Sequence, residues 1–169
     1  MREDVHAINV TMRARSGYKF WDELLDRPLP WLDALGLEWD LFQTSDILWK
    51  RRNCDELLDS ALSGILAKGR GISVATKMLH IKRPRLFPVL DSYVVETIGG
   101  TPKTPNIELL RHVRREGRRN LAEMERIQAY LAERGVRRSL VRIMDALLWT
   151  SYPKSAYYPM RELLNEWSK

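Results

Sequence analysis

Apolar residues recur at three- and four-residue steps along almost the whole chain. This spacing places them on one face of an α-helix, whereas a half-buried strand requires strict alternation, which the sequence lacks. Glycine and proline interrupt the pattern at short intervals and supply the turns between helices. The 169 residues therefore predict one all-α domain, residues 1–169, built as a compact multi-helix fold.

The expected helices all show apolar side chains at the spacing of an α-helix. They cover residues 4–13, 19–26, 45–51, 55–66, 72–81, 92–98, 106–115, 119–134, 138–149 and 159–167. Trp21 and Trp149 lie on apolar faces, which favours packing in the core. The alternative use of a tryptophan, stacking on an exposed base, is open to Trp31, Trp39 or Trp49.

Positive charge is concentrated in one segment. Residues 103–142 contain eleven basic and five acidic side chains, so this segment alone accounts for the formal net charge of +6. A basic balance favours polyanionic partners. If one helix continues through the segment, five arginines form a single basic stripe, but Gly117 is expected to break it. DNA contact and a solvated corner both remain open for these residues: Arg111, Arg114, Arg115, Arg118 and Arg119.

The sequence predicts neither a metal or cofactor site nor a secretory or membrane location. The single cysteine, Cys54, cannot form an intramolecular disulfide, and His6, His80 and His112 share no metal-ligand spacing, so we expect no metal and no cofactor. The first ten residues contain no uninterrupted apolar stretch, which argues against a secretory signal or a membrane span. A cytoplasmic protein without a membrane partner is the simplest interpretation.

Residues 55–91 predict a helix-hairpin-helix element. Two amphipathic helices are joined by Lys68-Gly69-Arg70-Gly71, and glycines permit the sharp turn and a close approach of the backbone to another molecule. The unpaired N–H groups at the start of the second helix would suit a DNA phosphate. The alternative is a tight turn with a solvated basic rim. The predicted contacts to the DNA backbone are Lys68, Gly69, Arg70, Gly71, Ser73, Lys77, Lys82, Arg83 and Arg85.

The same stretch resembles the helix-hairpin-helix DNA glycosylase superfamily, the group that contains endonuclease III and adenine DNA glycosylase. Gly69, Gly71 and Ala75 match its hairpin glycines and helix alanine, and Phe87-Pro88-Val89-Leu90-Asp91 is similar to the segment that carries the catalytic aspartate. The resemblance implies a DNA-glycosylase-like fold, a double-stranded DNA partner and Asp91 as the catalytic acid.

The resemblance also implies which glycosylase chemistry to expect. The lysine of lyase-type members lies eighteen residues before the aspartate, and this position is Ser73 here. Serine cannot form a Schiff base, so the expected enzyme is monofunctional and removes a modified or mismatched base without nicking the strand. Lys77, one helical turn beyond Ser73, is a weaker catalytic candidate.

Three features depart from the superfamily or have a structural explanation. Arg70 replaces a small apolar residue of the hairpin, and only some sixty residues precede the hairpin, fewer than these enzymes use to complete their cleft. Asp91 also precedes an apolar-periodic segment, which suits a helix N-cap. The alternatives to an enzyme are therefore a non-catalytic module that binds the DNA backbone and a helical protein-interaction domain.

A further resemblance covers residues 44–152. The runs KMLHIKRPRLFPVLDSYVVETIG and RRSLVRIMDALLWT look like a bacterial family of uncharacterised proteins with a glycosylase-like hairpin, a Lys-Arg-Pro loop and a Leu-x-Arg-x-x-Asp-x-x-x-Trp helix. That resemblance implies a fold and no established activity. In its last helix, the three-residue spacing of Arg142 and Asp145 predicts an ion pair rather than a second catalytic carboxylate.

Overall fold

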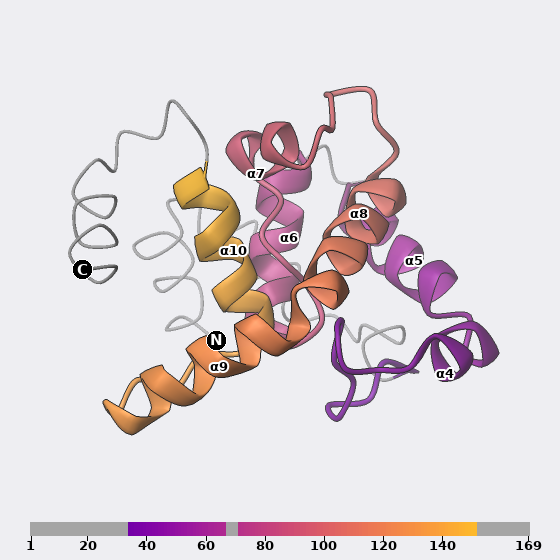
Figure 1. The fold of residues 1–169 in the computed structure, drawn as a ribbon. Helices are drawn as coiled ribbons and strands as arrows, with labels where there is room; N and C mark the ends of the chain where they lie inside the picture. Colours follow the sequence, from indigo (N-terminus) through magenta and orange to yellow (C-terminus); the bar gives the residue numbers. More distant parts are fainter. Residues whose placement is uncertain (1–33, 67–70, 152–169) are drawn as a thin grey trace, which may run out of the picture.

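The computed structural model describes residues 34–66 and 71–151. The predicted helices at 4–13, 19–26 and 159–167 lie outside these ranges, as do Trp21, Trp31 and most of the hairpin turn. The described helices follow one another as drawn in Figure 1: α4 (Asp46–Arg51), α5 (Cys54–Leu66), α6 (Ile72–Lys82), α7 (Ser92–Thr97), α8 (Asn106–Arg119), α9 (Leu121–Glu133) and α10 (Leu140–Ser151).

The all-helical prediction is confirmed for the described residues, which contain helices and turns and no strand. Serine side chains cap the starts of two helices. Ser45 accepts the Leu48 N–H with its side chain at the start of α4, and Ser139 accepts the Arg142 N–H at the start of α10. Most predicted boundaries differ from the observed ones by only one or two residues.

The helices pack around a shared apolar core, with α6 near the centre of the view in Figure 1. α5 lies against α4, α6 and α8, while α10 lies against α7 and α9. The buried core residues from these helices recur at the spacing that the sequence showed. Among them are Leu58, Leu62 and Ile65 of α5, Ala75, Met78 and Leu79 of α6, Leu109, Leu110 and Val113 of α8, and Leu140, Val141 and Met144 of α10.

The break expected at Gly117 was wrong. α8 runs through Gly117 to Arg119, and the chain turns only at Asn120, after which α9 begins. The glycine serves packing instead of ending the helix. A Cβ at residue 117 would lie closer than 3.0 Å to three atoms of the fully buried Phe42 ring. The Phe42 ring therefore occupies a notch in the surface of α8, and the five arginines share one uninterrupted helix.

The Gly117→Ala variant tests this close contact. Alanine favours helix by about 1 kcal/mol over glycine, but overpacking a filled site costs roughly 1–3 kcal/mol. We expect urea denaturation to show a net loss of up to about 2 kcal/mol in the free energy of unfolding. In the Phe42→Leu background the same change should cost less, because the smaller side chain leaves room. Equal costs in both backgrounds would contradict the contact.

Candidate functional site

The start of α6 is the described part of the predicted hairpin. Gly71 is the N-cap with φ −73°, so it does not use the positive φ that the sequence suggested for the hairpin glycines. In the described part of the chain, Gly71 supplies no side-chain cap and the first turn of α6 has no acidic residue. No described atom lies within 4 Å of the place where a Cβ on Gly71 would be. No side chain within residues 34–66 and 71–151 therefore caps the first N–H groups of α6, and a helix start of this kind favours an anion.

The predicted contact residues on α6 and in the loop after it are divided between the two ends of this helix. Gly71 and Ser73 lie at its first turn, and Lys77 lies one turn further on the same face. Lys82, Arg83 and Arg85 lie at or beyond its last turn, roughly 15 Å away by helical rise. The structure therefore does not bring all the predicted DNA contacts to one place.

The two arginines at the far end also have partners within the protein. Arg83 Nε donates to the Leu35 carbonyl at 3.0 Å, and Arg85 Nε lies 3.3 Å from an oxygen of the buried Asp40. These contacts fasten the segment before α4 to the loop after α6. Arg85 keeps 49% of its side-chain surface exposed, so it retains a face toward solvent.

Asp91 acts as the N-cap of α7. Its Oδ1 accepts the N–H groups of Tyr93 at 3.1 Å and Val94 at 3.0 Å, and its Oδ2 accepts the Trp149 indole N–H at 2.9 Å. The capping role predicted from the sequence is confirmed. The bond to Trp149 adds a link between α7 and α10 that the sequence did not indicate. Asp91 remains partly exposed, so both oxygens are held without the side chain being fully buried.

Lys77 lies near this carboxylate. Burial lowers the pKa of Lys77, and the negative charge of Asp91 acts against that shift. Ser73 precedes Lys77 by one turn on α6. The structure thus places Lys77, the weaker catalytic candidate, close enough to Asp91 for their charges to interact.

The segment that delivers Asp91 is fastened to the helices on either side of it. His80 of α6 donates its Nδ1–H to the Phe87 carbonyl at 2.6 Å, and the Thr76 hydroxyl accepts the Leu90 N–H at 3.0 Å. On the other side, the Val89 N–H lies 3.2 Å from both carboxylate oxygens of Asp145 in α10. The backbone of the segment is therefore fixed by side chains of α6 and α10.

Asp145 is buried, with 4% of its surface exposed. Its pKa is raised to about 7, chiefly by burial and to a smaller extent by the charge of Asp91, while the Val89 N–H and Arg142 act in the opposite direction. The predicted pair with Arg142 is confirmed at 3.8 Å between Nη1 and Oδ2. The sequence suggested the pair but gave no sign that Asp145 also binds the backbone next to Asp91.

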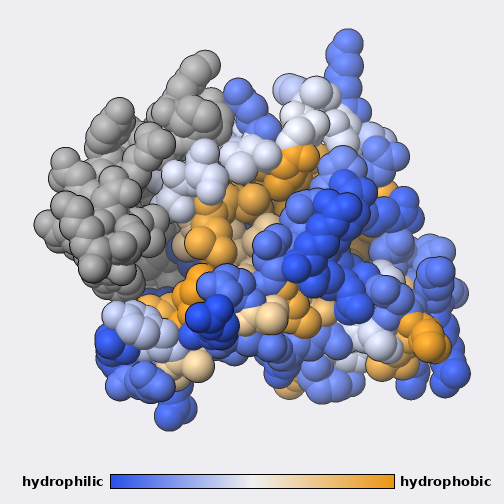
Figure 2. All heavy atoms as spheres, in the orientation of Figure 1, coloured by the Kyte–Doolittle hydropathy of each residue, from blue (hydrophilic) through white to orange (hydrophobic). Residues whose placement is uncertain are grey.

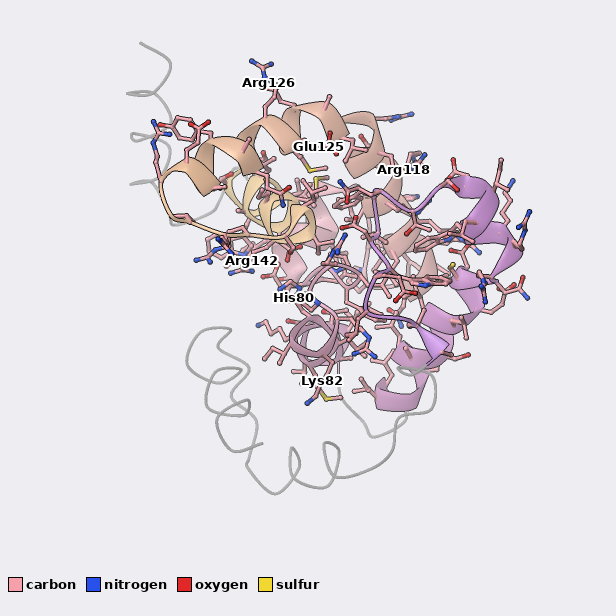
Figure 3. The ribbon with its side chains drawn as sticks, turned by 90° about the horizontal axis from the view of Figure 1, so that it is seen from below. His80, Lys82, Arg118, Glu125, Arg126 and Arg142 are labelled. Atoms are coloured by element: carbon pink, nitrogen blue, oxygen red, sulfur yellow. The ribbon has the colours of Figure 1, made fainter. Side chains whose placement is uncertain are left out.

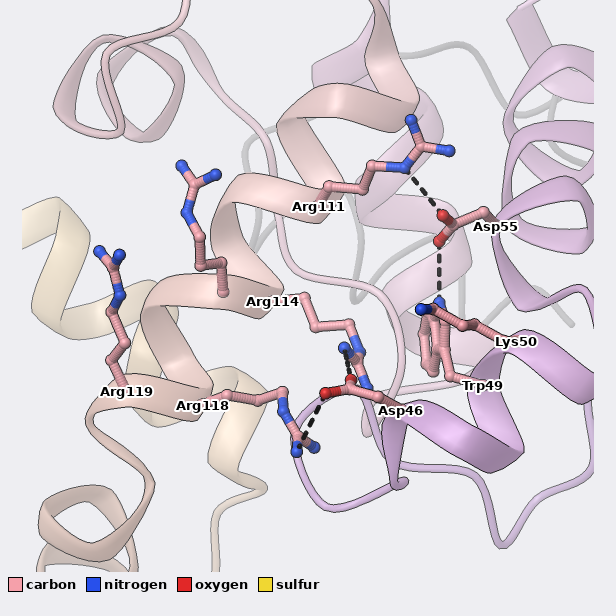
Figure 4. Close-up of a pocket in the computed structure, with 9 residues that line it drawn as sticks. Asp46, Trp49, Lys50, Asp55, Arg111, Arg114, Arg118 and Arg119 are labelled. Atoms are coloured by element: carbon pink, nitrogen blue, oxygen red, sulfur yellow. Dashed lines mark hydrogen bonds and ion pairs between the residues drawn. The ribbon is translucent and has the colours of Figure 1, made fainter.

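A second polar site lies on α8, at the opposite end of α5 from the hairpin. Figure 2 shows strongly hydrophilic residues following α8 across this face, and Figure 4 shows the pocket between α8, α4 and the start of α5. We call it the α8 pocket. It has a volume of about 470 Å³, and its cationic lining comprises Lys50, Arg111, Arg114, Arg115, Arg118 and Arg119.

Carboxylates and backbone carbonyls orient several of these cations. Asp55 accepts Arg111 Nε at 2.8 Å, and Asp46 accepts Arg114 Nη1 at 2.6 Å. The hydrogen bond from Arg114 lowers the pKa of Asp46, which keeps this carboxylate ionised. The sequence signalled the arginines through their three- and four-residue offsets, but nothing in it placed Lys50, Asp46 or Asp55 beside them.

The family of the chain follows from the match of its sequence to a protein-family model. The model of a family described as "Family of unknown function (DUF6308)" matches residues 4–152. The chain belongs to the DUF6308 family. No curated protein and no solved structure gave a significant match. Membership of DUF6308 confirms the prediction of a family of unknown function, whereas a relation to DNA glycosylases stays a prediction.

The described residues of this DUF6308 chain show neither a metal site nor a membrane-spanning helix. Within residues 34–66 and 71–151, no three His, Cys, Asp or Glu side chains gather in a way that could hold a metal ion. None of the helices in these ranges has the length and apolar character needed to cross a membrane.

The raised pKa of Asp145 predicts a pH dependence of stability. The folded protein holds this proton up to about pH 7, whereas the ordinary value for the unfolded chain is 3.8, so stability falls as the pH rises between these values. Asp145→Asn removes the titration. We expect its free energy of unfolding, relative to the wild type, to rise from about pH 4 to pH 7 and then level off. Urea denaturation across this range measures the difference.

A matched control for the pH series is Asp59→Asn, because Asp59 is an exposed carboxylate on α5. Its free energy of unfolding relative to the wild type should change little over the same range. A flat difference for Asp145→Asn would show that the buried carboxylate does not hold its proton in the folded state.

Proposed function

We propose that this chain binds the phosphate backbone of duplex DNA through the amino-terminal end of α6 and the hairpin before it. The observation that carries the proposal is the start of α6, where no described side chain caps the first N–H groups of an eleven-residue helix. A helix start of this kind favours an anion through both its N–H groups and its dipole. A phosphate group is the anion that DNA offers at regular intervals.

The charges near this helix start support the same partner. Lys68 and Arg70 precede it in the sequence, and Lys77 follows on the next turn. Contacts of this kind read no base, so affinity should be largely independent of sequence and should fall steeply with salt. Dissociation constants of roughly 10⁻⁴ to 10⁻⁶ M at physiological salt are typical of such binding.

Ser73→Glu is a sharp test of this binding site. A carboxylate in the first turn of α6 interacts favourably with the helix dipole, so the fold should be retained. The same charge repels a phosphate at the first N–H groups of the helix. We expect affinity for a fluorescently labelled duplex, measured by anisotropy at low salt, to fall about tenfold, equivalent to about 1.4 kcal/mol.

Ser73→Gln is the matched control, because it has nearly the same size and no charge. Its affinity should stay close to that of the wild type. If Ser73→Glu and Ser73→Gln bind equally well, the start of α6 is not the contact. If the full chain binds no duplex even at low salt, the DNA proposal is wrong and a helical protein-interaction domain is favoured.

Monofunctional base excision is a second candidate function, favoured by the groups around Asp91. The buried Asp145 carboxyl lies near Asp91, and its pKa is raised to about 7 by burial and, to a smaller extent, by the charge of Asp91. Pairs of titratable groups whose environments differ are typical of acid–base sites. Asp91 would stabilise the positive charge that develops on the sugar when a base leaves, and the base would be flipped out of the duplex.

Base release from duplexes with modified or mismatched bases tests this second function. Asp91→Asn keeps a side chain that caps helices well, so α7 should survive. We expect the variant to lose about 10²-fold or more in the rate of base release while its affinity for DNA is retained. Borohydride should trap no adduct on abasic DNA, since Ser73 supplies no amine. An adduct would contradict the monofunctional assignment, and unchanged release by Asp91→Asn would contradict the role of Asp91.

A further inference from the structure

The α8 pocket has a strong excess of positive charge that its own carboxylates do not cancel. Six cationic side chains line its described walls, together with Asp46 and Asp55. Glu116, beside the pocket, pairs with both Arg115 at 3.5 Å and Arg119 at 2.8 Å, so one carboxylate serves two guanidinium groups. The described cations thus exceed the carboxylates by three, which calls for a ligand with several negative charges.

The inner arginines are fixed in place before any ligand arrives. Arg118 Nη1 donates to the carbonyl groups of Phe42 at 2.9 Å and Thr44 at 3.0 Å. Arg114 Nη2 donates to the same Thr44 carbonyl at 2.8 Å. Arg114 and Arg118 also share one carboxylate, Asp46, at 2.6 and 3.6 Å, so a single negative charge is divided between two guanidinium groups and positive charge remains. Pre-organised donors lose little entropy when they bind.

The outer arginines remain available. Arg115 and Arg119 have 54% and 66% of their side-chain surfaces exposed. They lie one turn apart on α8, about 6 Å along its axis, and Arg111 lies one turn before Arg115. Arginines repeated at successive turns suit an extended chain of phosphate groups better than a single phosphate, because each turn can contact a different group.

The pocket offers little for a nucleobase. Trp49, the aromatic residue among its described walls, is only 6% exposed, and its indole N–H donates to Asp55 at 2.8 Å. The Arg114 guanidinium covers the Trp49 ring, 4.3 Å from its centroid. The ring is therefore already occupied by a cation–π contact. A base would therefore gain no stacking partner from Trp49.

We propose that the α8 pocket binds the polyphosphate chain of a small ligand, such as inorganic tripolyphosphate or the triphosphate of a nucleotide. Its volume of about 470 Å³ is in the range of small-molecule sites. The site is separate from the start of α6, because α5, which runs between them, spans roughly 18 Å.

Isothermal titration calorimetry of the full chain with sodium tripolyphosphate tests the proposal. The wild type should bind one equivalent saturably, and ATP should bind within a few-fold of tripolyphosphate because the base contributes little. Orthophosphate should bind at least tenfold more weakly. If ATP alone binds, recognition depends on the nucleoside, and the proposal is wrong. If neither compound binds saturably, the pocket is not a polyphosphate site.

The double variant Arg115→Ala/Arg119→Ala should weaken tripolyphosphate binding at least tenfold. Both side chains are exposed, so thermal unfolding should be nearly unchanged. Arg126→Ala is the matched control: Figure 3 shows Arg126 pointing away from the outer side of α9, and it pairs only with Glu123 among the described residues. Lys50→Ala provides an independent change on the opposite wall. Equal losses in the double variant and Arg126→Ala would indicate nonspecific attraction and overturn the proposal.

Different results would contradict duplex binding at the start of α6 and polyphosphate binding in the α8 pocket. Ser73→Glu should keep tripolyphosphate binding if the α8 pocket is an independent site, even when duplex binding is lost. Tripolyphosphate binding by a chain that binds no duplex would support the pocket and contradict the DNA proposal. If the double variant loses duplex binding while the wild type shows no tripolyphosphate binding, the arginines belong to a DNA surface, and the pocket proposal is wrong.

Discussion

The bond between Asp145 and the Val89 backbone determines much of the arrangement around it. A buried carboxylate needs strong hydrogen bonds or a proton, and here it has the Val89 N–H and a nearby arginine. This contact joins α10 to the extended segment before α7. His80 and Thr76 join the same segment to α6, so Asp91 reaches its position through a backbone that two helices hold.

The helical architecture was predictable because local information dominates it. The apolar period and the capping residue Asp91 act over a few residues, and the period placed the described helices well. Long-range contacts were not predictable in this way. Phe42 fills the notch at Gly117 from seventy-five positions away, so the glycine looked like a helix breaker in the sequence. Likewise, Trp149 and Asp91 carry no shared local pattern, although they bond at 2.9 Å.

In the candidate sites, too, short-range features were predictable from the sequence and long-range contacts were not. The Arg142–Asp145 pair and the capping role of Asp91 follow from short spacings on one helix or at its start. The basic loop after α6 gave the same kind of signal as the hairpin, but two of its arginines hold the segment before α4. Charge in a sequence indicates the sign of a partner, whereas the tertiary fold decides which charges face that partner.

Phe42 connects the core of the molecule to the electrostatics of its surface. Its ring packs against Gly117, while its carbonyl orients the Arg118 guanidinium at 2.9 Å. The packing of the Phe42 ring therefore also influences where the Arg118 guanidinium lies above α8. Substitution of the exposed arginines can change the positive charge of the α8 pocket at little cost to the stability of the fold. The orientation of the Arg118 guanidinium depends instead on the backbone carbonyls of residues 42 and 44, which lie next to the packing contact between Phe42 and Gly117.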